Sequence, residues 1–135
     1  MEIRKAKLSE ISAIKKFVDS FAEMDVISET FSEKYYQRIL NKGILLACLD
    51  KDELIGVCFG TYNIKEKWAD LLGLAVKQDW RKKGIGSSLI KEFEKIVKQN
   101  KIGMIDLYAE KNQIKLFNEL GYLEGRTYTS FRKKF

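Results

Sequence analysis

Residues 77–88 read Lys-Gln-Asp-Trp-Arg-Lys-Lys-Gly-Ile-Gly-Ser-Ser, and they join two elements of different type. The apolar run before them, Trp68 to Val76, predicts a β-strand. After them, apolar residues recur every three or four positions, which predicts an amphipathic helix from about Ile85 to Asn100. The segment therefore leads from the end of a strand into the beginning of a helix.

The composition of this loop favours a bound pyrophosphate group. Gly84 and Gly86 allow a sharp turn and a close approach of the backbone to a ligand. The helix that follows directs unpaired N–H groups and the positive end of its dipole back at the loop. Three consecutive side chains add positive charge: Arg81, Lys82 and Lys83. Together these features are typical of a diphosphate cradle.

Two other phosphate-binding motifs fit the loop poorly. A Walker A loop has Gly-Lys-Ser/Thr, whereas here Gly86 is followed by Ser87 and Ser88. A dinucleotide fingerprint has a third glycine at the position that Leu89 occupies. Taken alone, the loop is also compatible with a charged turn that only faces solvent.

The rest of the pattern predicts one mixed α/β domain over residues 1–135. Further strands are expected at Glu2–Lys5, Ile44–Leu49, Leu54–Tyr62 and Met104–Ala109. Helices are expected after an N-cap at Ser9, from Ser32 to just before Gly43, and from Ile114 to a stop at Gly121. The tail, Arg126 to Phe135, alternates weakly, and we expect it to close the sheet as a last strand.

The two cysteines are expected to be buried, reduced thiols. Cys48 and Cys58 flank a predicted hairpin turn at residues 50–53. If the end residues of this turn pair, Cys48 lies opposite Ile55 and Cys58 opposite Leu45, so the thiols point to opposite faces and cannot bridge. The chain has no histidine, which excludes Ser-His-Asp and Cys-His nucleophiles and leaves a zinc site almost without ligands.

The charge balance suits an anionic partner. The chain carries 25 Lys and Arg against 19 Asp and Glu, a formal net charge of +6. Such a partner is a nucleic acid, a membrane surface or a phosphorylated cofactor. No apolar run approaches the roughly 20 residues of a membrane helix, and the N-terminus has no signal-peptide pattern. We therefore expect a cytoplasmic protein without a membrane partner.

Three segments resemble the GNAT superfamily of N-acetyltransferases. The stretch from Arg81 to Gly86 is similar to its Arg/Gln-x-x-Gly-x-Gly/Ala motif, and it follows a strand that ends Leu-Ala-Val, as in that family. Residues 116–122, Leu-Phe-Asn-Glu-Leu-Gly-Tyr, resemble its aromatic-x-x-Leu-Gly-Phe/Tyr segment, and residues 3–11 are similar to the way many members begin. The resemblance covers essentially the whole chain. It implies the GNAT fold, in which a central, mostly antiparallel twisted sheet is flanked by about four helices.

The resemblance implies acetyl-coenzyme A as cosubstrate. Backbone N–H groups of the cradle would hold its pyrophosphate. Arg81 begins the motif, and Ser87 would add a hydroxyl at its end. The residues of this predicted cofactor site are Arg81, Lys82, Lys83, Gly84, Ile85, Gly86 and Ser87. The strand beside the pantetheine arm would include Leu74, Ala75 and Val76. In the family a bulge in this strand directs a backbone N–H at the thioester carbonyl. Gly73 and Leu74 are the candidates, since a glycine inside a strand often marks a bulge, and this N–H would stabilise the oxyanion.

The family's catalytic groups are carried over less completely. In members that acetylate lysine, a carboxylate early in this strand is the general base, and Asp70 stands at the matching place. Asp70 is equally compatible with a strand start at the surface, and Glu110 is a second candidate base. The family often has a tyrosine as general acid where this chain has Phe117, which removes that hydroxyl. Tyr108 or Tyr122 would be substitutes, although packing is the simpler role for each.

An acidic segment precedes the second helix and, in the resembled family, walls the acceptor site. Residues 19–33 hold five acidic side chains and no Lys or Arg. Such a wall would favour a cationic amine, on a small molecule or on a protein lysine or N-terminus, although it is also compatible with an ordinary charged face.

Two other function classes remain as alternatives. One is a coenzyme A-binding GNAT domain without turnover, which acts as a sensor or binds a partner. The other is an RNA-associated protein that uses residues 81–83 and the Arg-Lys-Lys cluster at 132–134, although these lack interleaved aromatic residues. We therefore expect acetyl-coenzyme A and an amine as partners rather than nucleic acid, with a homodimer left open.

Overall fold

A computed structural model describes residues 1–22 and 30–135 of the chain as a five-stranded sheet with helices on both faces. The strands are β1 (Glu2–Lys5), β2 (Ile44–Asp50), β3 (Glu53–Asn63), β4 (Trp68–Val76) and β5 (Met104–Leu107). The α-helices are α1 (Ile11–Ala22), α2 (Glu33–Lys42), α3 (Ile85–Gln99) and α4 (Ile114–Glu119). Short 3-10 turns, η1 (Leu8–Glu10), η2 (Gln78–Trp80) and η3 (Lys111–Gln113), precede α1, α3 and α4.

The sheet has the strand order β1-β2-β3-β4-β5. The first three strand pairs are antiparallel, and β4 pairs with β5 in parallel. A parallel pair needs a long crossover, which α3 provides between β4 and β5. The mixed, mostly antiparallel sheet confirms the predicted α/β fold class.

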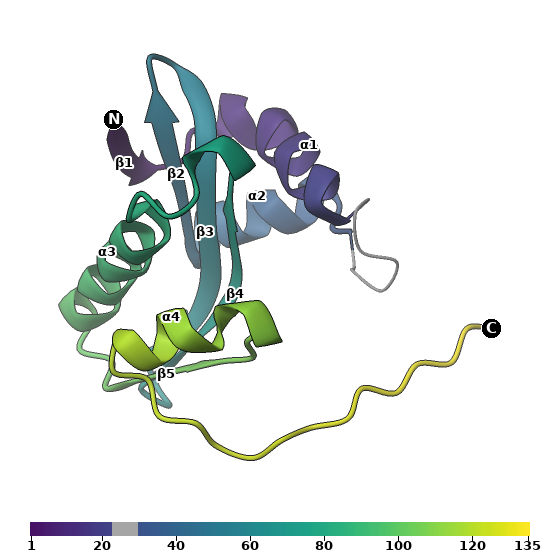
Figure 1. Cartoon of the computed structure of the whole chain (residues 1–135), viewed down its shortest axis with the longest axis vertical. Helices are drawn as coiled ribbons and strands as arrows, with labels where there is room; N and C mark the ends of the chain where they lie inside the picture. Colours follow the sequence, from purple (N-terminus) through teal and green to yellow (C-terminus); the bar gives the residue numbers. More distant parts are fainter. Residues whose placement is uncertain (23–29) are drawn as a thin grey trace.

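Each face of the sheet carries its own hydrophobic cluster. In Figure 1, α1 and α2 cover one face and α3 covers the other. Strand β2 shows why both faces are apolar, because its residues alternate: Ile44, Leu46 and Cys48 pack under α3, while Leu45 and Ala47 pack under α1 and α2. Helix α3 buries Leu89, Ile90 and Phe93 among the residues of its apolar stripe. Within residues 1–22 and 30–135, every helix is too short or too polar to cross a bilayer.

The β2–β3 hairpin corrects the predicted placement of the cysteines. Its end residues pair as expected, and the turn residues Lys51 and Asp52 have φ of 48° and 67°, as tight hairpins require. However, β3 carries a bulge, so Cys48 pairs with Gly56 instead of Ile55, and Cys58 pairs with Leu46. Both thiols therefore lie on the α3 face. They are free and buried, and burial raises the pKa of each.

The two predicted helix starts have different outcomes. Ser32 is an N-cap as expected, because its Oγ accepts a hydrogen bond from the Tyr35 N–H at 3.2 Å. Ser9 is not a cap, since it lies inside η1. There Lys7 is the N-cap residue, and the Glu10 carboxylate accepts the Lys7 N–H at 2.7 Å, as the N3 residue of a capping box does.

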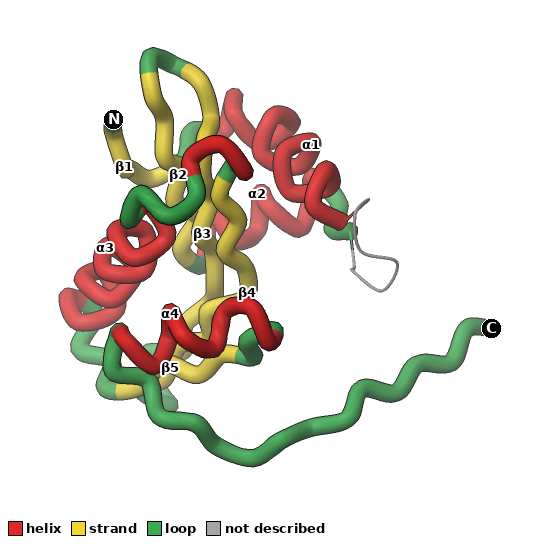
Figure 2. The backbone as a smooth tube through the Cα atoms, in the orientation of Figure 1, coloured by secondary structure: helices red, strands yellow, loops and turns green. Residues whose placement is uncertain are grey.

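The tail does not form the predicted last strand. Residues 123–135 carry no strand pairing and run away from the body of the protein (Figures 1 and 2). Their large apolar side chains include Tyr128, Phe131 and Phe135, all exposed. Steps of three and four residues between these side chains place them on both faces of any strand, so no single face is apolar enough to bind the sheet.

Candidate active site

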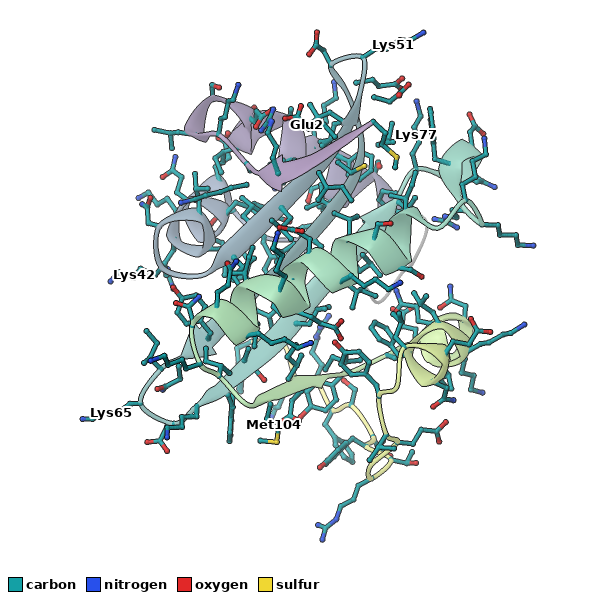
Figure 3. The ribbon with its side chains drawn as sticks, turned by 90° about the vertical axis from the view of Figure 1, so that its left-hand side faces the viewer. Glu2, Lys42, Lys51, Lys65, Lys77 and Met104 are labelled. Atoms are coloured by element: carbon teal, nitrogen blue, oxygen red, sulfur yellow. The ribbon has the colours of Figure 1, made fainter. Side chains whose placement is uncertain are left out.

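Strands β4 and β5 separate halfway along β4, and this separation defines the candidate site. The two strands pair only from Trp68 to Leu71 on β4. Beyond that point residues 73–76 still pair with β3, but among the described residues no strand pairs with their other edge. In Figure 3, Lys77 marks the end of β4 beside the beginning of α3, and Met104 marks the start of β5 toward the other end of that helix. One edge of β4 is therefore open next to the helix start.

A bulge in β4 lies at the beginning of this open edge, as the sequence predicts. Phe59 of β3 pairs with Gly73 while its neighbour Gly60 pairs with Leu71, which leaves Leu72 as the extra residue. A Cβ atom at residue 73 would overlap the ring of Phe59. Glycine is therefore required at 73 for the bulged strand to lie close to β3.

The alternation of β4 decides which backbone groups face the open edge. The Lys77 N–H donates to the Ile55 carbonyl of β3 at 2.8 Å. The Val76 carbonyl instead accepts a hydrogen bond from Arg81 Nε at 3.1 Å, so it faces away from β3. Because N–H and C=O directions alternate along a strand, Leu74 shares the direction of Val76 and Gly73 that of Lys77. Of the two predicted oxyanion donors, Leu74 has the N–H on the open edge.

The loop after β4 turns sharply into α3. Lys82 and Gly84 have positive φ angles of 60° and 81°. Intrahelical hydrogen bonds begin with the Ser88 N–H, which donates to the Gly84 carbonyl at 3.0 Å. The N–H groups of residues 85–87 therefore precede the helical ladder and have no intrahelical acceptor. This places three amides at the positive end of the helix dipole.

The shape of this helix start fits a pyrophosphate. A Cβ at Gly84 would meet no atom within 4 Å, so the backbone there is open to a ligand. A Cβ at Gly86 would lie 3.8 Å from side-chain atoms of Leu74 and Leu116 and 3.9 Å from one of Val76. Gly86 is therefore at the point where α3, β4 and α4 converge. The side chains of residues 81–83 are exposed and make the surroundings positive.

Two cations of this loop lie over aromatic rings. The Arg81 guanidinium is 5.6 Å from the ring centre of Phe21 in the last turn of α1. Lys83 Nζ is 5.1 Å from the ring centre of Trp80. The Arg81–Phe21 contact is absent from the sequence expectations, because nothing local links residues sixty positions apart.

The structure places a second carboxylate beside the predicted base. Asp70 is half-buried and accepts a hydrogen bond from Trp68 Nε1 at 3.2 Å. Its partner in β5 is Asp106. Parallel partners in register project from the same face of a sheet, and Ala69 and Leu71 pack on the α3 face. Asp70, which is half-buried, and Asp106, which is exposed, therefore lie on the sheet face opposite α3. Nothing in the local sequence marks Asp106 as a site residue. It lies opposite Asp70 only through the β4–β5 register, which the crossover through α3 sets.

The other two predicted catalytic side chains lie at the protein surface. Glu110 is exposed at the start of η3, where its N–H donates to Gln113 Oε1 at 3.4 Å. Tyr108 is 85% exposed, and its ring packs edge-on against Tyr128 at 5.7 Å between centres. Neither residue is a strand partner of Asp70, whereas Asp106 is.

Phe117 and Tyr122 pack together beside α3. Phe117 is buried, and its ring meets Tyr122 edge-on at 5.4 Å between centres. The Tyr122 hydroxyl donates to Glu94 Oε2 of α3 at 2.9 Å. Burial, followed by this hydrogen bond, raises the pKa of Tyr122. Its hydroxyl is therefore engaged in joining the segment after α4 to α3.

The predicted acidic wall is described only in part. Glu23, Asp25 and Glu29 lie outside the described residues. Asp19 forms an ion pair with Lys15 at 2.7 Å, and Lys15 Nζ also donates to the Phe31 carbonyl at 2.8 Å. The charge of Asp19 is thus largely compensated within the protein.

Comparison with known proteins identifies the family of this domain. Residues 12–122 match the Acetyltransferase (GNAT) family. The chain belongs to that family, and it is an acetyltransferase. A relative from Chlorobaculum tepidum, named as an uncharacterized N-acetyltransferase, is 25% identical over 123 residues, which are 90% of this chain and 75% of the relative.

Solved structures share the fold at low sequence identity. An acetyltransferase from Trypanosoma brucei has a TM-score of 0.80 at 14% identity and covers 98% of this chain and 99% of its own. A ribosomal-protein-alanine N-acetyltransferase from Brucella melitensis has a TM-score of 0.76 at 16% identity, covering 99% and 98%. An aminoglycoside acetyltransferase from an uncultured soil metagenomic sample, in complex with sisomicin, has a TM-score of 0.75 at 16% identity, covering 98% and 96%.

Proposed function

We propose that this protein transfers the acetyl group of acetyl-coenzyme A to a primary amine by direct attack in a ternary complex. The observation that carries the proposal is the open edge of β4, residues 72–76, next to the unpaired amides of residues 85–87. A ligand with a diphosphate at one end and an extended arm at the other suits both features. The family uses acetyl-coenzyme A in general, which supports this cosubstrate.

The backbone of this chain supplies binding and charge stabilisation. Amides of the loop and of residues 85–87 hold the diphosphate, and the open edge of β4 pairs with the amide groups of the arm. The Leu74 N–H donates to the thioester oxygen, which becomes negative when the amine attacks the carbonyl carbon. The bulge at Leu72 orients this N–H.

Asp70 is the proposed general base. It accepts the proton that the attacking amine loses, directly or through one water molecule. The C–N bond forms, the C–S bond breaks, and the leaving thiolate takes a proton from solvent. A thiol has a pKa near 8.5, so its departure without a dedicated acid is chemically tolerable when Phe117 stands at the usual tyrosine position.

The proposed acceptor is a cationic amine. Two carboxylates, Asp70 and Asp106, lie on the same sheet face, in the stretch where β4 and β5 still pair. Paired negative charges attract a protonated polyamine, aminosugar or lysine side chain. Structural neighbours of the same fold include an aminoglycoside acetyltransferase and a ribosomal-protein-alanine N-acetyltransferase, which supports the amine class without selecting a member of it.

Thermal denaturation with acetyl-coenzyme A, followed by turnover assays on amines, tests the proposal. Cosubstrate at 100 times its dissociation constant should add about 2.7 kcal/mol to the free energy of unfolding. The amines should include spermidine, an aminoglycoside and a lysine peptide, with free thiol as the readout. Absence of any shift with the cosubstrate would count against the proposed cradle.

A second candidate function is coenzyme A binding without turnover. One observation favours it: Phe117 is buried against Tyr122, and the Tyr122 hydroxyl is bonded to Glu94. A higher unfolding temperature with coenzyme A, together with no release of free coenzyme A from acetyl-coenzyme A in the presence of any amine of the panel, would support this sensor function over catalysis.

A further inference from the structure

Arg81 begins the cradle, and its side chain contacts the end of β4 and the last turn of α1. Its Nε donates to the Val76 carbonyl at 3.1 Å, at the end of β4. Its guanidinium carbon lies 5.6 Å from the ring centre of Phe21, in the last turn of α1. The side chain thus joins three segments: the loop, the strand end and α1.

Phe21 is itself fixed from the protein interior. Its ring meets the ring of Phe17 edge-on, with centres 5.2 Å apart and planes at 64°. Phe17 packs against the cluster under α1 and α2. The ring that receives Arg81 is therefore anchored to the core, and it presents a π-face to a cation.

We propose that Phe21 is a positioning residue for the cosubstrate loop, and that Arg81 acts as a clamp on this loop instead of as a phosphate ligand. The inference deepens the proposed function and rests on it. By holding Arg81, Phe21 fixes the residue that directly precedes the left-handed turn at Lys82. The clamp thereby pre-orders the amides of residues 82–87, so less conformational entropy is lost when a diphosphate binds.

Amide hydrogen exchange in the ligand-free protein tests the clamp itself. We expect Phe21→Leu to increase exchange at residues 82–84, because the cation–π contact is lost. Phe21→Tyr keeps the π-face and should leave exchange as in the wild type. Arg81→Gln removes both the cation over the ring and the Nε–H that donates to Val76, so it should increase exchange at least as much as Phe21→Leu. Unchanged exchange in both Phe21→Leu and Arg81→Gln would overturn the proposal.

Affinity for coenzyme A, measured by titration calorimetry, tests the consequence. Phe21→Leu should weaken binding by roughly two- to five-fold, the value of a cation–π contact at an exposed site. The effects of Phe21→Leu and Arg81→Gln should not add, because both break one unit. Arg81→Lys keeps a cation for the ring of Phe21 but loses the Nε–H that donates to the Val76 carbonyl, so it should weaken binding less than Arg81→Gln.

The outcomes separate the clamp from the proposed function. If Phe21→Leu keeps wild-type affinity while Arg81→Gln loses it, Arg81 is a phosphate ligand and the clamp is refuted. Additive losses in the double variant also refute it. If the wild type does not bind coenzyme A, the proposed function fails, while the exchange measurement still decides whether Phe21 orders the loop.

Discussion

The ring of Phe59 occupies the space that a side chain at Gly73 would take. A Cβ at 73 would overlap two ring atoms, Cε1 and Cζ. The ring also packs edge-on against Tyr36, at 5.5 Å between centres, within the cluster under α1 and α2. The bulge in β4, and with it the direction of the Leu74 N–H, therefore depends on the packing of Phe59 of β3 against α2.

Replacing Gly73 by alanine should lower both stability and activity. The added methyl group forces Phe59 or β4 to move, which costs about 1–3 kcal/mol in well-packed interiors. Urea unfolding measures the loss. The double variant Gly73→Ala/Phe59→Leu should recover part of the stability, because leucine vacates the ring position. No recovery would show that the strain does not arise from this contact.

Replacing Gly84 by valine should abolish cosubstrate binding with a small loss of stability. The left-handed φ of 81° strains any β-branched residue, at a cost of about 1–2 kcal/mol. The protein itself leaves the site open, so the side chain would collide with the ligand. Gly121→Val is the matched control, because Gly121 has φ of 90° and open space but lies after α4. Equal losses of affinity in both variants would show that backbone strain alone is responsible.

Replacing Asp70 by asparagine should reduce kcat by about 10²–10⁴-fold, the usual contribution of a general base. Affinity for coenzyme A should be unchanged, because the side chain is not part of the cradle. Asp106→Asn removes the same charge from the neighbouring strand, and it should mainly raise the KM for a cationic acceptor. A larger loss of kcat in Asp106→Asn than in Asp70→Asn would assign the base to β5.

Local signals allowed the elements around the site to be predicted. The bounds of β4, the Ser32 cap and the glycines of the cradle follow from periodicity and backbone preference within a few residues. The bulge in β3 does not follow, because it depends on distant packing. A Cβ at Gly56 would lie 3.0 Å from Leu89 of α3, so the close approach of this helix goes together with the shift in register.

The pairings that define the site are also long-range. Asp106 lies opposite Asp70 only because β4 and β5, which α3 connects, pair in this parallel register. Phe21 contacts Arg81 only because α1 ends beside the loop. The predicted last strand in the tail is wrong, because the spacing of the apolar residues 128, 131 and 135 does not follow the period of two that a half-buried strand needs.

Tyr122→Phe should reduce stability and leave the chemical step intact. The hydroxyl donates to the Glu94 carboxylate at 2.9 Å, and hydrogen bonds to charged groups contribute about 1.5–3 kcal/mol. Thermal unfolding measures the loss, and kcat with a saturating amine should stay near the wild-type value. A large fall in kcat in a variant that is still folded at the assay temperature would instead identify Tyr122 as the acid for the leaving thiolate.

The ion pair of Arg4 and Glu10 should make the protein less stable in acid. The two terminal guanidinium nitrogens, Nη1 and Nη2, donate to the carboxylate at 2.8 Å, and this hydrogen bonding, with that from the Lys7 N–H, lowers the pKa of Glu10 from its ordinary value of 4.5 to about 2. A carboxyl group with a lowered folded-state pKa stabilises the fold fully above its unfolded pKa. That contribution is lost as the pH falls from 4.5 through 2.

Comparing Glu10→Gln with the wild type between pH 7 and 2 isolates this contribution. The difference in unfolding free energy should be about 1–2 kcal/mol at neutral pH, since both side chains are partly solvated, and it should shrink toward zero as the pH falls to 2. Glu119→Gln is the control, because its pair with Lys115 spans 4.0 Å between two exposed side chains. A Glu10→Gln difference that stayed constant with pH would mean that lost packing, and not ionisation of Glu10, causes it.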